Sequence, residues 1–126
     1  MQALIPGSLP ELLLPAGSFD SAIAAIEGGA DALYLGFSDF SARSQARNFD
    51  RLQYRRLYRL AREKGIRLYV ALNTVILQDE MEKAARLLAF LRRFPPDAVI
   101  VQDWGLARII RNGYPERWTC RRRSRR

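Results

Sequence analysis

The sequence predicts an α/β protein made of four consecutive βα units. Short apolar runs alternate four times with segments of helical periodicity along the 126 residues. These runs are apolar on both faces, which is typical of parallel strands covered by helices. A doubly wound sheet and a closed (β/α)8 barrel fit this spacing about equally. A complete barrel needs about 250 residues and eight units, so the chain would supply half of one.

The first unit begins with the apolar run 12–14, which predicts a buried strand that ends in the turn 15–17. Ser18 can cap the helix that follows. Asp20 lies in the first turn of that helix, where the helix dipole favours an acid. The glycine pair at 28–29 ends the helix.

The second unit contains a predicted strand, 30–37, and then an irregular polar loop, 38–48, that is long for a βα connection. Asp50 caps a second helix, and Gly65 ends it. Its core-facing side chains follow the spacing i, i+3, i+4, i+7 and are Tyr54, Leu57, Tyr58 and Ala61.

The third unit pairs the strand 66–72 with a helix that the acidic pair 79–80 opens and the arginine pair 92–93 closes. Each charge lies at the dipole end that favours it. The fourth unit pairs the strand 98–101 with a short helix, 105–112.

Composition excludes several kinds of catalytic centre. The chain contains no histidine, so it cannot supply a Ser-His-Asp triad, a Cys-His pair or a histidine-ligated metal site. Its single cysteine, Cys120, excludes an internal disulfide, a CxxC redox pair and a cluster or zinc site made by this chain alone. The apolar stretches are too short to span a membrane, and the first ten residues lack the features of a secretory signal. We therefore expect a cytoplasmic protein.

The net charge of +8 suggests a nucleic-acid partner, but the position of the charge weakens that interpretation. Six of the 19 arginines lie in residues 117–126, which contain no acid, and this leaves +2 for residues 1–116. We divide the chain into a nearly neutral α/β domain, 1–116, and a basic tail, 117–126.

In either fold, functional groups are expected where the strands end, at the carboxyl edge of the sheet. The turn 15–17 could present backbone N–H groups to an anion, although an ordinary βα turn is the favoured interpretation. The loop 37–49 suits an anionic or polar ligand, or else a solvated surface with Phe40 and Phe49 pinned to the core. Asp103 is either a general base or ligand group, or simply the cap of the next helix.

Four arginines form a basic stripe opposite the apolar face of the second predicted helix: Arg51, Arg55, Arg59 and Arg62. Contact with an RNA backbone is one interpretation. The favoured one is a solvated outer face, because the sequence indicates no aromatic stacking platform beside the stripe.

Several linked segments carry a resemblance to a known family. They are Glu-Leu-Leu-Leu-Pro-Ala-Gly at 11–17, Gly-Ala-Asp-Ala-Leu-Tyr-Leu-Gly at 29–36, Phe-Ser-Ala-Arg at 40–43, Ala-Arg-Asn-Phe at 46–49, Ala-Leu-Asn at 71–73 and Val-Ile-Val-Gln-Asp-Trp-Gly at 99–105. In order and spacing they resemble the opening of peptidase family U32, the collagenase-like peptidases, over residues 10–116.

The resemblance implies half of a TIM-type barrel at the amino end of a longer protein, apparently truncated here. It implies a collagenase-like peptidase activity with no agreed catalytic residues, acting on a peptide. Similar proteins instead hydroxylate RNA bases or ubiquinone precursors and hold an iron–sulfur cluster through cysteines that this chain lacks. The residues that match the family's motifs at the strand ends are expected to bind ligand rather than break bonds, with no metal: Pro15, Gly17, Tyr34, Gly36, Arg43, Asn48, Asn73, Gln102 and Asp103.

The tail departs from the family pattern, which continues into a fifth strand. Arginine codons are rich in C and G, so out-of-frame translation of a GC-rich gene produces arginine runs. We expect residues 117–126 to be out of frame or disordered. Downstream DNA that yields family-like sequence after a one- or two-base shift would support this, and its absence would contradict it. The competing interpretation is a genuine arm that makes the chain a free-standing RNA-binding module.

A truncated half barrel would lack the strands that its inward face packs against and would leave two strand edges unpaired. We therefore expect a fragment that is poorly stable, prone to self-association and inactive on its own.

Overall fold

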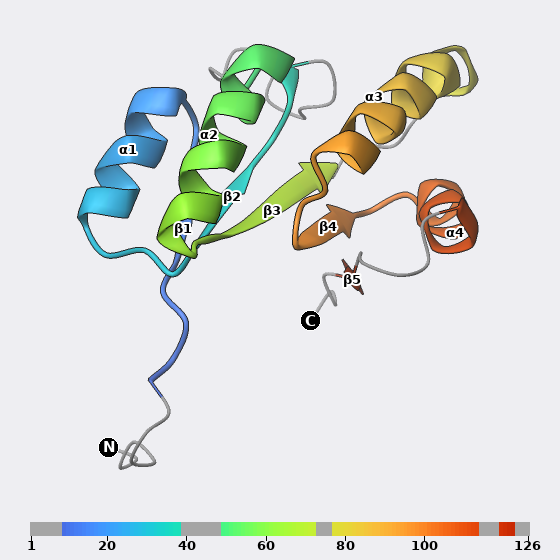
Figure 1. Cartoon of the computed structure of the whole chain (residues 1–126). Coiled ribbons are helices and arrows are strands. Elements are labelled where there is room, and N and C mark those ends of the chain that lie inside the picture. The colour runs from blue at the N-terminus through green and yellow to red at the C-terminus, as the bar shows by residue number, and fades with distance from the viewer. Residues whose placement is uncertain (1–8, 39–48, 73–76, 114–118, 123–126) are drawn as a thin grey trace.

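The computed structural model describes residues 9–38, 49–72, 77–113 and 119–122. Its centre is a parallel five-stranded sheet with helices along one side (Figure 1). The elements, in chain order, are β1 Leu13–Pro15, α1 Phe19–Glu27, β2 Ala32–Leu35, α2 Arg51–Lys64, β3 Arg67–Leu72, the 3-10 turn η2 Gln78–Glu80, α3 Met81–Arg93, β4 Ala98–Val101, α4 Trp104–Gly113 and β5 Thr119–Arg122. The four predicted βα units and the α/β class are confirmed.

The strand order distinguishes between the two predicted architectures. Each strand pairs in parallel with the next one along the chain, in the order β1-β2-β3-β4-β5. A doubly wound sheet reverses direction at a switch point, whereas a (β/α) barrel adds its strands in sequence. The sheet therefore has the arrangement of a partial barrel.

Local chemistry sets the helix ends as predicted. Ser18 Oγ accepts a hydrogen bond from the Ser21 amide at 3.1 Å. Asp50 and Gln53 form a reciprocal capping box, with distances of 2.8 Å and 3.2 Å between the donor and acceptor atoms. Gly65 ends α2 in the left-handed conformation, with φ of 68°.

Two boundaries differ from the sequence prediction. β2 covers only Ala32–Leu35 of the predicted strand 30–37, while Phe37 makes an isolated bridge with Phe49. The acidic pair predicted to open the third helix lies in η2, and the Glu80 carboxylate accepts a hydrogen bond from the Leu77 amide at 3.1 Å. A tight 3-10 turn thus precedes α3, as often happens at helix amino ends.

Strand β5 lies inside the segment predicted to be a basic tail. Its backbone pairs with β4, from Ala98 opposite Thr119 to Val101 opposite Arg122. The sequence analysis expected residues 117–126 to be out of frame or disordered, and the four residues of β5 carry no apolar pattern. Pairing to the open edge of β4 uses backbone N–H and C=O groups and does not need such a pattern.

The core lies between the sheet and its helices. One apolar cluster joins residues from all four helices to alternate strand residues, including Leu33 and Leu35 of β2. Strand side chains point alternately to the two faces, so the intervening residues lie on the opposite, helix-free face. In a barrel this face is the inner one.

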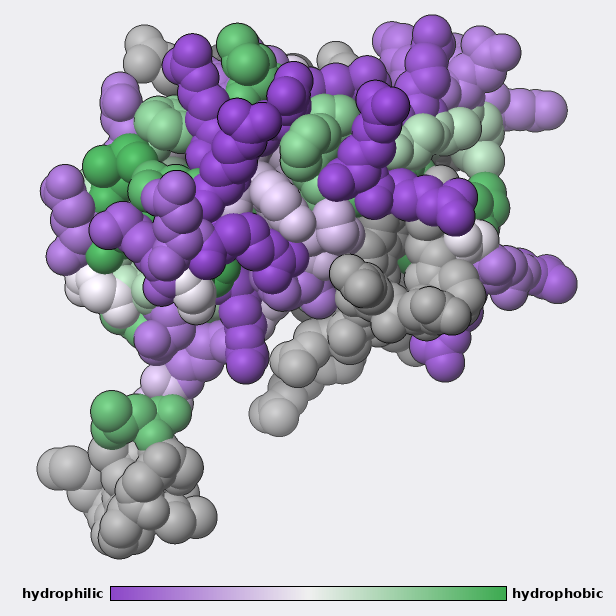
Figure 2. All heavy atoms as spheres, viewed as in Figure 1, coloured by the Kyte–Doolittle hydropathy of each residue, from purple (hydrophilic) through white to green (hydrophobic). Residues whose placement is uncertain are grey.

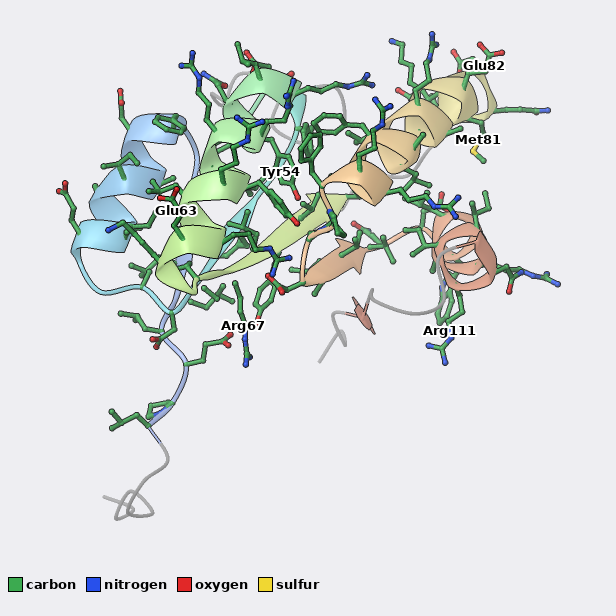
Figure 3. All side chains as sticks on the ribbon, viewed as in Figure 1. Tyr54, Glu63, Arg67, Met81, Glu82 and Arg111 are labelled. Atoms are coloured by element: carbon green, nitrogen blue, oxygen red, sulfur yellow. The ribbon has the colours of Figure 1, made fainter. Side chains whose placement is uncertain are left out.

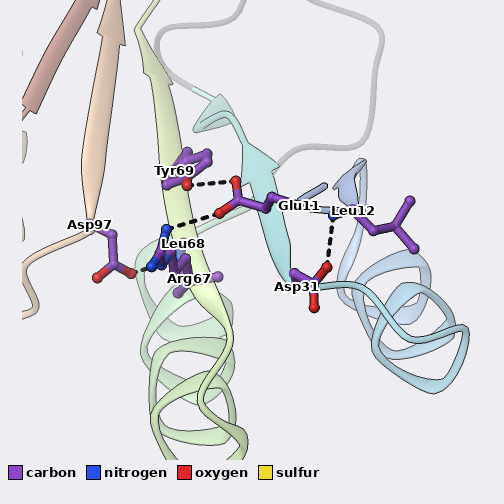
Figure 4. A network of polar contacts seen from close by, with 7 residues as sticks. All are labelled: Glu11, Leu12, Asp31, Arg67, Leu68, Tyr69 and Asp97. Atoms are coloured by element: carbon purple, nitrogen blue, oxygen red, sulfur yellow. Dashed lines mark hydrogen bonds and ion pairs between the residues drawn. The ribbon is translucent and has the colours of Figure 1, made fainter. Parts of the chain in front are cut away.

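Two aspartates fix the strands at their amino edge (Figure 4). Asp31 Oδ2 accepts a hydrogen bond from the Leu12 amide at 2.8 Å, while its own amide donates to the Leu12 carbonyl at 2.9 Å. Asp97 makes the same two contacts with Leu68, both at 2.8 Å. Each carboxylate extends the hydrogen bonding of the sheet by one step beyond the strand.

Among the described residues, no helix combines the length and apolar character needed to cross a membrane.

Candidate functional site at the strand ends

The helix-free face carries a row of flat side chains that runs from the last residue of β1 to the third residue of β3. Register places Pro15 of β1 beside Tyr34 of β2, and Tyr34 beside Tyr69 of β3. The Ala16 amide donates to the Tyr34 carbonyl at 2.9 Å and holds the end of β1 against β2. Tyr34 is 38% exposed, and its hydroxyl has no hydrogen-bond partner within the described ranges. The row therefore offers an accessible aromatic surface.

A polar network supports this row from below (Figure 4). The Tyr69 hydroxyl donates to Glu11 at 2.8 Å, and Arg67 pairs with the other oxygen of the same carboxylate at 3.0 Å. Burial, and then the hydrogen bond to Glu11, raise the pKa of Tyr69 above its usual value. Glu11 precedes β1 and its two partners belong to β3, so the contact spans β2. Ala32 of β2 lies between them and is completely buried, although it belongs to the helix-free face. The network thus fixes the Tyr69 ring.

The predicted glycines have backbone roles. The Gly36 carbonyl accepts a hydrogen bond from the Phe49 amide at 3.1 Å, which returns the chain to the sheet after the long loop. Phe49 is fully buried, as the surface-loop alternative expected, and Phe40 lies outside the described residues. Gly17 lies exposed in the turn before α1. Because Ser18 itself satisfies an amide of the first turn of α1, the turn has the local structure of an ordinary βα connection.

Asp103 caps α4. Its Oδ1 accepts a hydrogen bond from the Leu106 amide at 3.0 Å, and its carbonyl accepts from Ala107 at 3.0 Å. A Cβ atom at Gly105 would lie 3.1 Å from Asp103 Oδ1, so the glycine leaves room for the cap. The capping interpretation is confirmed. Gln102 is exposed beside it, two strands away from Tyr34.

Three of the predicted ligand residues lie outside the described part of the chain: Arg43, Asn48 and Asn73. The described members of the set divide into two places. Pro15, Gly17, Tyr34 and Gly36 lie at or just after the ends of β1 and β2, and the pair 102–103 follows β4.

A hollow of about 540 Å³ opens at the amino ends of α1 and α2, next to the carboxyl edge of β1 and β2. Its lining is mostly polar and consists of Ser18, Phe19, Asp20, Ser38, Asp50, Gln53 and Arg56. The sequence had assigned Ser18, Asp20 and Asp50 only to helix starts. Their convergence arises because both helices begin at the same edge of the sheet.

The arginine stripe on α2 has aromatic neighbours, so the expectation of a stripe without them was wrong. The Arg51 guanidinium lies 5.5 Å from the centre of the Phe90 ring, and Arg55 lies 5.1 Å from the Phe94 ring. Both rings belong to the region of α3, about 40 residues along the chain. Sequence proximity could not show this contact, because it depends on how α2 and α3 pack.

Sequence reasoning also missed Glu11, Arg67 and Tyr69. A usable signal was present, since Leu33-Tyr34-Leu35 and Leu68-Tyr69-Val70 repeat one apolar-aromatic-apolar pattern. Side chains alternate between the two faces of a strand, and the two tyrosines occupy the same position in this pattern. In adjacent parallel strands they therefore lie on the same face.

The residues of this chain do not fit an iron–sulfur cluster of the kind that the family resemblance implies for longer proteins. Such clusters need several cysteine thiolates, and the chain has one cysteine. In the ranges that the structure describes, no three potential ligands among His, Cys, Asp and Glu converge on one point.

Sequential parallel strands with helices on one face define an α/β protein whose sheet has the arrangement of a partial (β/α) barrel. A family model described as peptidase family U32 matches residues 17–118. The chain belongs to peptidase family U32, as its motifs predicted.

Two curated relatives carry different functional names. The chain is 40% identical over 99 residues to the 23S rRNA 5-hydroxycytidine synthase of Escherichia coli, covering 79% of this chain and 15% of the relative. It is 33% identical over 99 residues to an uncharacterized protease of Methanocaldococcus jannaschii, covering 79% of this chain and 24% of that relative. The chain thus spans about a quarter or less of these proteins.

The fold agrees with a solved structure, that of the U32 peptidase Mk0906. The TM-score is 0.67 at 13% sequence identity, and the match covers 96% of this chain and 52% of the other. The chain therefore corresponds in fold to about half of that structure.

Proposed function

We propose that this chain supplies the base-binding part of a U32 protein that hydroxylates an RNA base. The observation that carries the proposal is the row formed by Pro15, Tyr34 and Tyr69 on the inner face. An exposed aromatic ring beside a second, fixed ring suits a flat heteroaromatic ligand, because RNA-binding proteins hold unstacked bases on aromatic side chains. The position near the strand ends is where barrel enzymes bind their substrates.

The comparison with the 23S rRNA 5-hydroxycytidine synthase supports the same proposal. That relative is named for a reaction on a pyrimidine base, and its similarity extends over 99 residues of this chain. A base drawn into a barrel must leave its stack, and a ring that stacks on it offsets part of that cost.

Peptide hydrolysis is the second candidate. It is favoured by the relative named as a protease, which is 33% identical over a segment of the same length. A peptidase needs a nucleophile or an activated water. Among the hydroxyls and carboxylates near the described strand ends, Ser18, Asp50 and Asp103 already accept capping hydrogen bonds.

The test compares Tyr34→Ala with Tyr34→Phe in the complete gene product. The RNA of a strain that lacks the gene, complemented with each variant, is digested to nucleosides, and hydroxylated bases are measured by mass spectrometry. We expect the alanine variant to lose about tenfold of the product, because base–aromatic stacking contributes roughly 1–3 kcal/mol. The phenylalanine variant keeps the ring and should retain the activity.

Two results would contradict the proposal. One is a hydroxylated-nucleoside profile that does not change when the gene is deleted. The other is cleavage of gelatin by the purified gene product, with Tyr34→Ala affecting that cleavage and leaving the RNA nucleosides unchanged.

A further inference from the structure

The positive charge of the folded part gathers on two neighbouring helices. α2 carries five arginines and Lys64 against Glu63, and α3 carries three arginines and Lys83 against Glu82, which gives net charges of +5 and +3. Residues 1–116 carry +2 in total, so those outside these two helices carry −6. Although residues 1–116 are nearly neutral in total, their charge is therefore unevenly distributed, positive on α2 and α3 and negative elsewhere. Long hydrophilic side chains cover α2 and α3 in Figure 2, with paler surface between them.

Aromatic rings lie directly under part of this charge. Besides Arg51 and Arg55, which cover Phe90 and Phe94, Arg62 lies 5.0 Å from the centre of the Tyr58 ring. A guanidinium that rests with its flat face on a ring still has its N–H groups at the edge. The rings thus help to hold these arginines in place. Arg62 also donates to the Pro95 carbonyl at 3.0 Å, whereas Arg51 and Arg55 make no side-chain hydrogen bond within the described ranges.

The rings themselves form a fixed layer between the helices. Tyr54, which Figure 3 labels between α2 and α3, has its centre 5.8 Å from that of Phe90, and Phe90 is 5.3 Å from Phe94. The Tyr54 hydroxyl donates to the Phe94 carbonyl at 2.8 Å and ties the two helices together. A surface built on this layer is preorganised, which lowers the entropy cost of binding.

Most of the α2 arginines lack an acidic partner. Arg62 lies 3.6 Å from Asp97, and this is the ion pair that α2 makes within the described ranges. Arg51, Arg55 and Arg59 have none there, and they recur every four residues, about 6 Å apart along the helix axis. An uncompensated row of this kind attracts a polyanion.

We propose that this surface, defined as the outward side of α2 and α3 with Arg51, Arg55 and Arg59 at its centre, binds the phosphate backbone of the RNA substrate. The inference rests on the proposed RNA function. Guanidinium groups cover the rings, so bases cannot stack on them, and the surface presents charge and N–H donors, which suit phosphate oxygens. Because α2 begins at the carboxyl edge of the sheet, its first residue, Arg51, belongs to the end of this surface that lies nearest the strand ends.

The experiment measures binding of the complete gene product to an unmodified 23S rRNA fragment at several salt concentrations. The double variant Arg55→Gln/Arg59→Gln removes two charges from this surface. The matched control, Arg108→Gln/Arg111→Gln, removes two exposed arginines from α4, which Figure 3 shows apart from the α2–α3 contact. Arg55→Lys/Arg59→Lys keeps the charge and shows whether loss of the guanidinium alone disturbs the fold.

We expect the α2 glutamine variant to bind about tenfold more weakly near 0.1 M salt and to lower the slope of log K against log salt by about 1.5–2. The control and the lysine variant should stay within about twofold, with their salt slopes unchanged. Equal losses in the α2 and α4 variants, or no loss in the α2 variant, would overturn the proposal. If RNA binding depends on the α2 arginines but no RNA base is hydroxylated, the proposed binding surface is supported and the proposed reaction is refuted. If the α2 variant instead binds and hydroxylates RNA as the wild type does, the proposed reaction is retained and the proposed binding surface is refuted.

Discussion

Single side chains decide how the strands of this protein join at their amino edge. Asp97 satisfies the Leu68 amide, which has no further strand to bond at that position, and it also lies 3.6 Å from Arg62. Asp31 does the same for Leu12. No buried side-chain nitrogen or oxygen lacks a partner in the part of the chain that the structure describes.

Replacement of Asp97 tests this role. Asp97→Ala leaves the partly buried Leu68 amide without its acceptor, so we expect a loss of about 1–3 kcal/mol in the free energy of unfolding, measured by urea denaturation. Asp97→Asn keeps an acceptor oxygen and should lose less. Asp79→Ala, which removes an exposed acid, is the control and should change stability by under about 0.5 kcal/mol. Similar losses in Asp97→Ala and in this control would show that the contact contributes nothing.

Tyr54 gives a prediction for alkaline pH. Burial, and then the neighbouring Tyr58, raise the pKa of Tyr54 well above its usual value near 10. The unfolded chain therefore releases the Tyr54 proton near pH 10 while the folded chain retains it. The stabilisation is complete below pH 10 and decreases as the pH rises above it, by up to about 1.4 kcal/mol per pH unit.

Tyr54→Phe isolates this contribution. The variant loses the hydrogen bond to Phe94, so it starts less stable at pH 8, but between pH 10 and 11 its stability should fall less steeply than that of the wild type. Urea titrations at these three pH values measure the difference. Parallel curves for both proteins would mean that Tyr54 ionises normally.

The helices are specified mainly by their ends. Ser18, the Asp50–Gln53 capping box and Gly65 act through neighbours within four residues. The two caps and the terminal glycine were predicted from the sequence, whereas the part that Gln53 plays in the capping box was not. The arginine stripe of α2 was also predicted, but the aromatic layer beneath it was not. A helical pattern indicates which face is polar and does not indicate which side chains of another helix lie against it.

Gly65 and Gly113 provide a matched pair of substitutions. Gly65 has φ of 68°, a region that disfavours side chains, and a Cβ atom there would meet no neighbour within 4 Å. Gly65→Ala should therefore cost about 1 kcal/mol through backbone strain alone. Gly113 also has open space around it but no such φ, so Gly113→Ala should be close to neutral. Thermal unfolding of both variants measures this, and equal shifts in the midpoint would contradict the role assigned to the Gly65 conformation.

At the scale of the whole molecule, the helices leave one face of the sheet uncovered. Leu13, 39% exposed, and Tyr34 lie on that face, and the described part of the chain gives β1 and β5 one strand neighbour each. In a closed barrel both the face and the edges would be paired. The 126-residue chain, expressed by itself, therefore presents apolar surface and open strand edges.

We accordingly predict that this chain self-associates at micromolar concentrations, as measured by sedimentation velocity. Leu13→Lys places a charge on the uncovered face and should shift the population towards monomer. Leu52→Lys is the control, because Leu52 is 56% exposed on α2, on the helix side of the sheet. A wild-type monomer with a cooperative thermal transition would contradict the prediction.

The sequence by itself determined the α/β class, the four βα units, the helix caps and the family, because each depends on local periodicity, short-range hydrogen bonds or linked motifs. It left the barrel and doubly wound arrangements open, and strand order decided between them. Tertiary structure alone brought Tyr34 beside Tyr69 and placed the α2 arginines over rings from the α3 region. The physical reason is that these contacts join residues about 35 to 40 positions apart, and no local pattern specifies which of many long-range partners a packed chain selects.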